Sequence, residues 1–169
     1  MPDATGLELI AQELGDAREG AVLDTEFFRG RALLVLEPGG AHDALAALQA
    51  RGFHFLSSLH GVDYFPEEPR LGVHYELLDM AAVDRISAKV RVDTQDPVLD
   101  SVVDLWPTAN FHEREVYDMF GVEFRGHPDP RRILMPEDYE GHPQRRDFPI
   151  GGEPVLFTHN EPSVPGWWK

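Results

Sequence analysis

Three strand-like runs follow one another between residues 53 and 93, and they constrain the fold more than any other feature of the sequence. The runs are FHFLSSLHGVDYF (53–65), LGVHYELLD (71–79) and ISAKVRVD (86–93), and only PEEPR (66–70) and MAAVDR (80–85) separate them. Apolar and polar residues alternate strictly through the third run, which is typical of a strand with one buried face. Because the connections are too short for a crossover helix, we expect hairpin-connected neighbours in one sheet.

The first 52 residues predict two helices around a hairpin. Residues 5–15 form an amphipathic pattern in which Thr5 and Glu8 have capping-box spacing and Gly15 marks the end. AVLDTEFF and ALLVLEP are separated by RGR, which indicates a hairpin with Gly30 in the turn. Residues 42–52 (HDALAALQARG) predict a second helix that ends at its final glycine.

Two further helices are expected after the third strand. In DPVLDSVVDLWP (96–107), Asp96 has the chemistry of an N-cap and Pro97 suits the first helical position. In NFHEREVYDMFG (110–121), Asn110 and Glu113 have capping-box spacing, and Gly121 closes the pattern. Proline and glycine are too frequent after residue 121 for long regular elements, so we expect residues 150–169 to form an extended arm.

This order of elements indicates an α+β fold of two layers. We expect a mixed, largely antiparallel sheet with helices packed on it, in the order α-β-β-α-β-β-β, followed by helices and an extended C-terminal arm. We assign residues 1–121 to the α+β domain, including the helix at 110–121, and residues 122–169 to an extended segment that ends in the arm.

Composition excludes several functions. The chain has no cysteine, so it carries no disulfide, thiol nucleophile, or Cys-ligated zinc or Fe–S site by itself. A formal net charge of −15 argues against nucleic acid and against direct docking on anionic lipid. No apolar run approaches the roughly 18 residues of a membrane span, and no secretory signal is visible. We therefore expect a soluble intracellular protein that meets a membrane only through a partner.

The pattern at 110–121 lacks the clean polar face of a surface helix. At about 100° per residue, Glu115 falls between Phe111 and Met119, and Glu113 falls between Phe120 and Tyr117. One interpretation is a helix buried on more than one side, with its carboxylates paired to nearby arginines. The other is an ordinary surface helix with i, i+4 pairs such as Arg114 with Asp118.

The same region allows two ligand hypotheses. Each of two Gly-His-Pro segments precedes an Arg-Arg pair, which could surround an anion, although no phosphate-binding glycine motif accompanies them. His112 and Glu115 are candidates for acid–base chemistry in a free-standing enzyme. Neither HExxH nor a two-His-one-carboxylate spacing occurs, so we expect no metal site.

The stretch FHEREVYDMFGVEFRGHPDPRRILMPEDYEGHPQRRDFP (111–149) resembles the signature of one family, with weaker similarity back to about residue 30. That family is the C subunit of the proton-translocating NADH–quinone oxidoreductase, respiratory complex I. Pro130 departs from it, because an apolar residue such as leucine is common there. The resemblance implies a structural and assembly subunit of the hydrophilic arm, peripheral on the cytoplasmic side of the inner membrane, within a translocase.

The resemblance also implies partners and cofactors. The large D subunit is the expected docking partner, next to the quinone site that it builds with the Fe–S-carrying B subunit. This chain itself is expected to bind no cofactor and to have no catalytic site, while the complex uses FMN, Fe–S clusters, NADH and quinone. An equivalent subunit of a membrane-bound hydrogenase-type complex remains an alternative.

Residues of the signature and the arm are the expected partner interface, with residues 122–169 wrapping the partner. They are Phe111, Glu113, Arg114, Glu115, Tyr117, Asp118, Phe120, His127, Arg131, Arg132, Glu137, Asp138, His142, Arg145, Arg146, Asp147, Trp167 and Trp168.

Overall fold

The computed structural model describes residues 3–149 and contains a five-stranded mixed sheet. In sheet order the strands are β1 (Val22–Phe28), β2 (Arg31–Leu36), β5 (Asp84–Val92), β4 (Leu71–Asp79) and β3 (Phe55–Asp63). Only the β2–β5 pair is parallel, and the other three pairs are antiparallel. The predicted α+β class and hairpin-connected strands are therefore confirmed.

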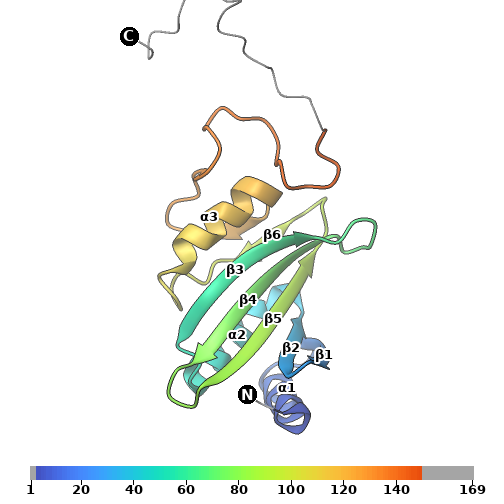
Figure 1. Ribbon diagram of the computed structural model, residues 1–169, viewed down its shortest axis with the longest axis vertical. Helices are drawn as coiled ribbons and strands as arrows, with labels where there is room; N and C mark the ends of the chain where they lie inside the picture. Colours follow the sequence, from blue (N-terminus) through green and yellow to red (C-terminus); the bar gives the residue numbers. More distant parts are fainter. Residues whose placement is uncertain (1–2, 150–169) are drawn as a thin grey trace, which may run out of the picture.

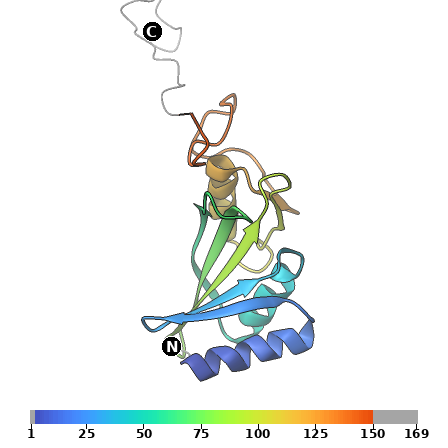
Figure 2. The same ribbon diagram turned by 90° about the vertical axis from the view of Figure 1, so that its right-hand side faces the viewer.

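The helices are α1 (Ala4–Ala17), α2 (Ala41–Arg51) and α3 (Ala109–Phe120), with the short 3-10 helix η1 (Pro38–Gly40) before α2. The core contains the inward side chains of the sheet, such as Leu34, Tyr75 and Ile86, together with Leu45 and Leu48 of α2. The helix α1 packs beside β1 and β2, whereas α3 packs against β3. The two helices therefore lie at opposite ends of the molecule (Figures 1 and 2).

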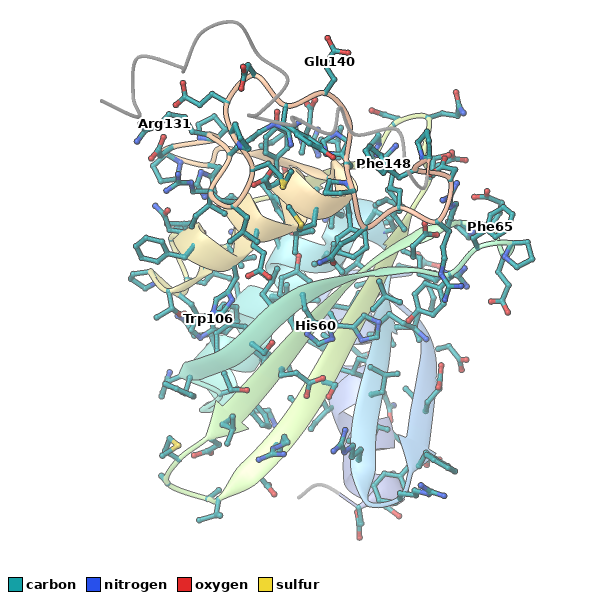
Figure 3. The ribbon with its side chains drawn as sticks, turned by 45° about the horizontal axis from the view of Figure 1, so that its top comes forward. His60, Phe65, Trp106, Arg131, Glu140 and Phe148 are labelled. Atoms are coloured by element: carbon teal, nitrogen blue, oxygen red, sulfur yellow. The ribbon has the colours of Figure 1, made fainter. Side chains whose placement is uncertain are left out.

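The other face of the sheet is polar and carries paired side chains. Ser87 donates a hydrogen bond of 2.7 Å to Glu76, and Lys89 lies 3.0 Å from Glu26. His60 and His74 stack across β3 and β4 with their ring centroids 5.3 Å apart. Figure 3 shows this face toward the viewer, with His60 on it. The alternation of apolar and polar residues at 86–93 thus matches a sheet that is covered by helices on one face and has polar side chains on the other.

The helix predicted at 96–107 is wrong. Residues Val98–Asp100 form β6, which pairs in parallel with β7 (Glu123–Arg125), and turns follow up to α3. Leu99 and Val102 are buried, so the apolar spacing that suggested a helix is satisfied by a short strand and a turn. Pairing with β7, more than twenty residues later, overrides the local signal.

Both predicted capping boxes are also wrong. The N-cap of α1 is Asp3, whose carboxylate accepts a hydrogen bond of 2.7 Å from the Gly6 amide, and the helix continues past Gly15 to Ala17. The helix α3 begins at Ala109 without a side-chain cap. Glu113 is turned into the interior, where its carboxylate has other partners. The predicted ends at Gly52 and Gly121 are confirmed.

Candidate functional site

The helix α3 is covered on two sides. On one side the Phe120 ring packs against the backbone of Gly61 on β3. On the other side residues 126–149, here called the C-terminal wrap, pass along the helix (Figure 1). The amide of Gln144 donates to the carbonyl oxygen of Met119 at 3.1 Å, and Arg145 donates to that of Phe120 at 2.5 Å. The burial on more than one side that the interleaved charges suggested is confirmed.

Asp118 is the main attachment point of the wrap. Its carboxylate is fully buried and accepts a hydrogen bond of 2.6 Å from Arg132. Its second oxygen accepts three backbone hydrogen bonds of 2.7–3.1 Å from the consecutive amides of Ile133, Leu134 and Met135. Together these donors lower the pKa of Asp118 against the opposing effect of burial, so the side chain stays ionised. One buried carboxylate thus binds four consecutive residues of the wrap and fixes their conformation.

Glu113 is the second buried carboxylate of α3, and arginines do not hold it. It accepts hydrogen bonds of 2.7 Å from the Ser101 hydroxyl and from the Val102 amide, just beyond β6. Burial raises the pKa of Glu113 to about 7 despite those two donors. The ring of His127 lies beside it, with Nε2 3.8 Å from the carboxylate. The expectation that arginines hold the carboxylates of this helix is therefore right for Asp118 and wrong for Glu113. Glu115 is exposed, and no arginine among residues 3–149 pairs with it.

Arg114 contacts the wrap through backbone oxygens. Its guanidinium donates to the carbonyl oxygens of Arg131 and Arg132 at 2.9 and 3.0 Å, and it lies 3.6 Å from Asp129. Arg131 in turn forms a two-point pair with Asp129 at 2.6 and 2.9 Å. The expected i, i+4 pair is absent from the described contacts of Arg114 and Asp118, because both side chains bind the wrap.

Both Gly-His-Pro histidines tie the wrap to α3. His127 accepts a hydrogen bond of 2.9 Å from the Asp129 amide through Nδ1, so Nε2 carries the proton that it donates to the Asn110 carbonyl at 3.1 Å. His142 donates through Nδ1 to the carbonyl oxygen of Asp118 at 3.1 Å and meets the Tyr117 ring edge-on. Burial lowers the pKa of His142. These contacts are structural, and they leave the histidines little capacity to surround an anion.

A second attachment joins the end of the wrap to the β3–β4 connection. Arg70 forms hydrogen bonds of 2.6 and 2.7 Å with Asp63 and two of 2.9 Å with Asp147. Asp63 also accepts from the Arg146 amide at 2.7 Å. The side chains of Arg70 and Asp63 are only 7% and 2% exposed, and their pairing lowers the pKa of Asp63. Sequence reasoning singled out Asp147 but missed Arg70 and Asp63, which lie some eighty residues earlier.

The remaining predicted interface residues divide into buried and exposed groups. Phe120 is buried and Tyr117 is half-buried. Phe111, Glu115, Glu137, Asp138 and Arg146 are exposed. Trp167 and Trp168 lie outside the described residues. Their assignment to a partner interface remains a prediction, as does the division of the chain after residue 121.

The two residues suggested for catalysis lie outside the hollow beside α3. A hollow of about 430 Å³ lies between α3 and β7 and is lined by Arg114, Tyr117, Phe124 and His127 among others. His112 and Glu115 do not line it, and Glu115 is exposed to solvent.

Comparisons with known proteins point to one family. Residues 34–154 match the family described as respiratory-chain NADH dehydrogenase, 30 Kd subunit. The C subunit of the NADH-quinone oxidoreductase of Roseiflexus sp. (strain RS-1) is 44% identical over 167 residues, which cover 97% of this chain and 94% of that protein. The NADH-quinone oxidoreductase subunit 5 of Thermus thermophilus is 43% identical over 149 residues, which cover 83% of this chain and 72% of that protein.

Solved structures share the fold. A trypsin-resistant fragment (1–134) of Nqo5 superimposes with a TM-score of 0.65 at 36% identity, covering 73% of this chain and 98% of the fragment. A chain of the membrane-bound sulfane sulfur reductase, an archaeal respiratory membrane complex, gives a TM-score of 0.70 at 24% identity over 85% of both chains. The second likeness concerns the fold alone. Among residues 3–149, no helix is both long and apolar enough to span a bilayer.

Proposed function

Because the chain belongs to the respiratory-chain NADH dehydrogenase 30 kDa subunit family, as a C subunit of NADH–quinone oxidoreductase, we propose that it docks on the large D subunit beside the quinone site through α3 and the C-terminal wrap. One observation carries this proposal. The wrap is fixed to α3 by buried charges, yet its outer side leaves large apolar side chains such as Leu134 in solvent. Apolar side chains on a rigid support are what a protein interface requires.

The chemistry of the complex is assigned to other subunits. Electron transfer from NADH to quinone uses FMN and Fe–S clusters, and this chain has no cysteine to ligate a cluster. The two buried carboxylates of α3, Glu113 and Asp118, are occupied by structural hydrogen bonds. We infer an assembly role within a proton-translocating enzyme, with no catalytic site in the isolated chain.

The proposed partners determine where in the cell the chain is located. The complex would hold this chain on the cytoplasmic side of the inner membrane, near the D and B subunits, with no membrane contact of its own. A charge of −15 supports attachment through proteins over direct binding to anionic lipid or nucleic acid.

The test is affinity purification of the tagged chain from gently solubilised membranes of its own organism, followed by mass spectrometry. Recovery of the B and D subunits with NADH-binding subunits supports the proposal. Recovery with a nickel-site subunit and no NADH module supports a hydrogenase-type complex. Recovery of the chain alone contradicts an assembly role.

A separate assay tests the absence of a catalytic site. The purified chain is expected to show no NADH oxidation with a quinone acceptor and no stoichiometric metal by elemental analysis. Turnover above the rate of a buffer control, or one metal ion per chain, contradicts this part of the proposal.

A further inference from the structure

The internal bonds of α3 and the wrap show which side chains are left to face outward. Arg114 and Asp118 hold residues 131–135 alongside the helix. Three large apolar side chains of these two segments are nevertheless exposed: Phe111 is 62% exposed, Leu134 61% and Ile133 37%. The Ile133 and Leu134 amides are held by Asp118 and Phe111 lies in α3, so little backbone conformational entropy is lost if a partner covers them.

The charges left unpaired on these two segments are mainly negative. Arg114 and Arg132 turn inward to backbone oxygens and to Asp118, and Arg131 is paired with Asp129. Besides Asp147, which is paired with Arg70, the exposed carboxylates are Glu115 on α3 and Glu137, Asp138 and Glu140 on the wrap. None of these four lies within ion-pair distance of a cation among residues 3–149, and Glu140 points away from the molecule (Figure 3). Arg146 is the exposed cation toward the other end of the wrap.

We infer that the exposed apolar and acidic side chains of α3 and the wrap form a docking patch for an apolar ridge of the D subunit that is flanked by lysines or arginines. The patch consists of Phe111, Ile133 and Leu134 and of the carboxylates of Glu115, Glu137, Asp138 and Glu140. This inference rests on the proposed function and adds the chemistry of the partner surface. Apolar residues at the centre and charges at the edge are the usual anatomy of an interface. The charged edge steers the encounter, and the apolar centre determines how long the complex lasts.

A second copy of the chain is a poor occupant of the same patch. A two-fold contact places the same surface on both sides, so the carboxylates of one copy would face those of the other. The chain as a whole carries a net charge of −15, which adds to that repulsion. A basic surface on a different subunit removes both costs.

The experiment measures association and dissociation rates of the full chain with a purified B–D subunit pair at several salt concentrations. The test variant carries Glu137→Lys and Asp138→Lys. The matched control carries Asp16→Lys and Glu19→Lys, which change the net charge equally at exposed positions in or just after α1, at the far end of the molecule. A third variant, Leu134→Ser, changes the apolar centre.

We expect the test variant to associate about tenfold more slowly at low salt and to show a weaker salt dependence, while the control stays within about twofold. Leu134→Ser is expected to raise the dissociation rate at least about tenfold, because it removes an apolar contact at the centre. If the two charge variants change the association rate equally, or if neither changes it, the inference that the acidic edge steers association is contradicted. An unchanged dissociation rate overturns the apolar centre. Sedimentation that shows a wild-type dimer broken by Leu134→Ser assigns the patch to a second copy instead.

Different results contradict the proposed docking on the D subunit and the proposed docking patch. If the wild-type chain does not bind the B–D pair, the proposed docking itself is wrong and this inference falls with it. If the wild-type chain binds and the variants bind equally well, docking stands and only the patch is wrong.

Discussion

Arg132 and Asp118 lie 14 residues apart in the chain, and the Nη1 atom of Arg132 is 2.6 Å from Oδ1 of Asp118. The other carboxylate oxygen accepts the next three amides of the wrap. One buried side chain therefore converts a proline-rich and glycine-rich segment into an ordered cover for α3. This contact explains why a charged residue occupies the interior of a helix that also carries Phe120 and Met119.

Asp118→Asn should destabilise the protein by about 3–5 kcal/mol, because it leaves the largely buried Arg132 guanidinium without its anion. Urea unfolding measures the free energy change, and hydrogen exchange should show faster exchange at the amides of residues 133–135. Asp138→Asn is the matched control, since Asp138 is exposed on the same segment and should change stability by less than about 0.5 kcal/mol. Equal stability of the two variants would contradict the role assigned to Asp118.

The raised pKa of Glu113 predicts that the stability of the protein depends on pH. Its folded pKa of about 7 lies above the ordinary value of 4.5, so between these values the folded state holds a proton that the unfolded state releases. Its contribution to stability is fully present below pH 4.5 and is lost as pH rises through 7. The unfolding free energy of the wild type, relative to that of Glu113→Gln, should therefore fall between about pH 5 and about pH 8.

Comparison with Glu113→Gln isolates this effect from other titrating groups. His74 is the main one, because burial lowers its pKa to about 4, and its contribution changes with pH in the opposite direction. A difference between the two proteins that stays constant from about pH 5 to about pH 8 would show that Glu113 does not titrate in that range.

Gly61 and Gly15 give a matched pair that tests the packing of α3. A Cβ atom at Gly61 would overlap the Phe120 ring, whereas one at Gly15 in α1 meets nothing within 4 Å. Gly61→Ala should cost about 1–3 kcal/mol through overpacking. Gly15→Ala should stabilise by about 0.5–1 kcal/mol, because alanine favours the helix. Thermal unfolding of both variants checks the opposite signs, and a neutral Gly61→Ala would contradict the contact with Phe120.

Arg70→Lys should loosen the end of the wrap. Lysine cannot reproduce the two-point pairs that Arg70 makes with Asp63 and Asp147. We expect a loss of about 1–3 kcal/mol and faster hydrogen exchange at the Arg146 amide, which Asp63 binds. Arg85→Lys is the control, because Arg85 is exposed and forms no ion pair with the residues that the structure describes. Unchanged exchange at the Arg146 amide would contradict the assignment.

The sheet could be predicted because its signals are local. Alternation from Ile86 to Val92 and the short connections between residues 53 and 93 indicate the strands and their antiparallel pairing. The glycine ends of α2 and α3 are likewise encoded within a few residues. The prediction for 96–107 is wrong, because pairing of β6 with β7 depends on residues more than twenty positions later.

The site was predictable only in part for the same reason. The interleaved charges of α3 indicated burial on two sides, but they did not identify the partners of each carboxylate. Glu113 is held by Ser101 and Val102, and no pattern in the sequence links these two residues to it. Arg70 and Asp147 meet across 77 residues and belong to no shared motif.

The most direct test of docking on the D subunit uses the absence of cysteine from the natural chain. Leu134→Cys or Phe111→Cys, each labelled with a short photo-cross-linker, is assembled into the intact complex and illuminated, and the cross-linked peptides are identified by mass spectrometry. Leu23→Cys on β1, which is exposed at the α1 end of the molecule, is the control. Docking through α3 and the wrap predicts adducts with the D subunit from positions 111 and 134 and none from position 23. Adducts with that subunit from position 23 alone would contradict the account.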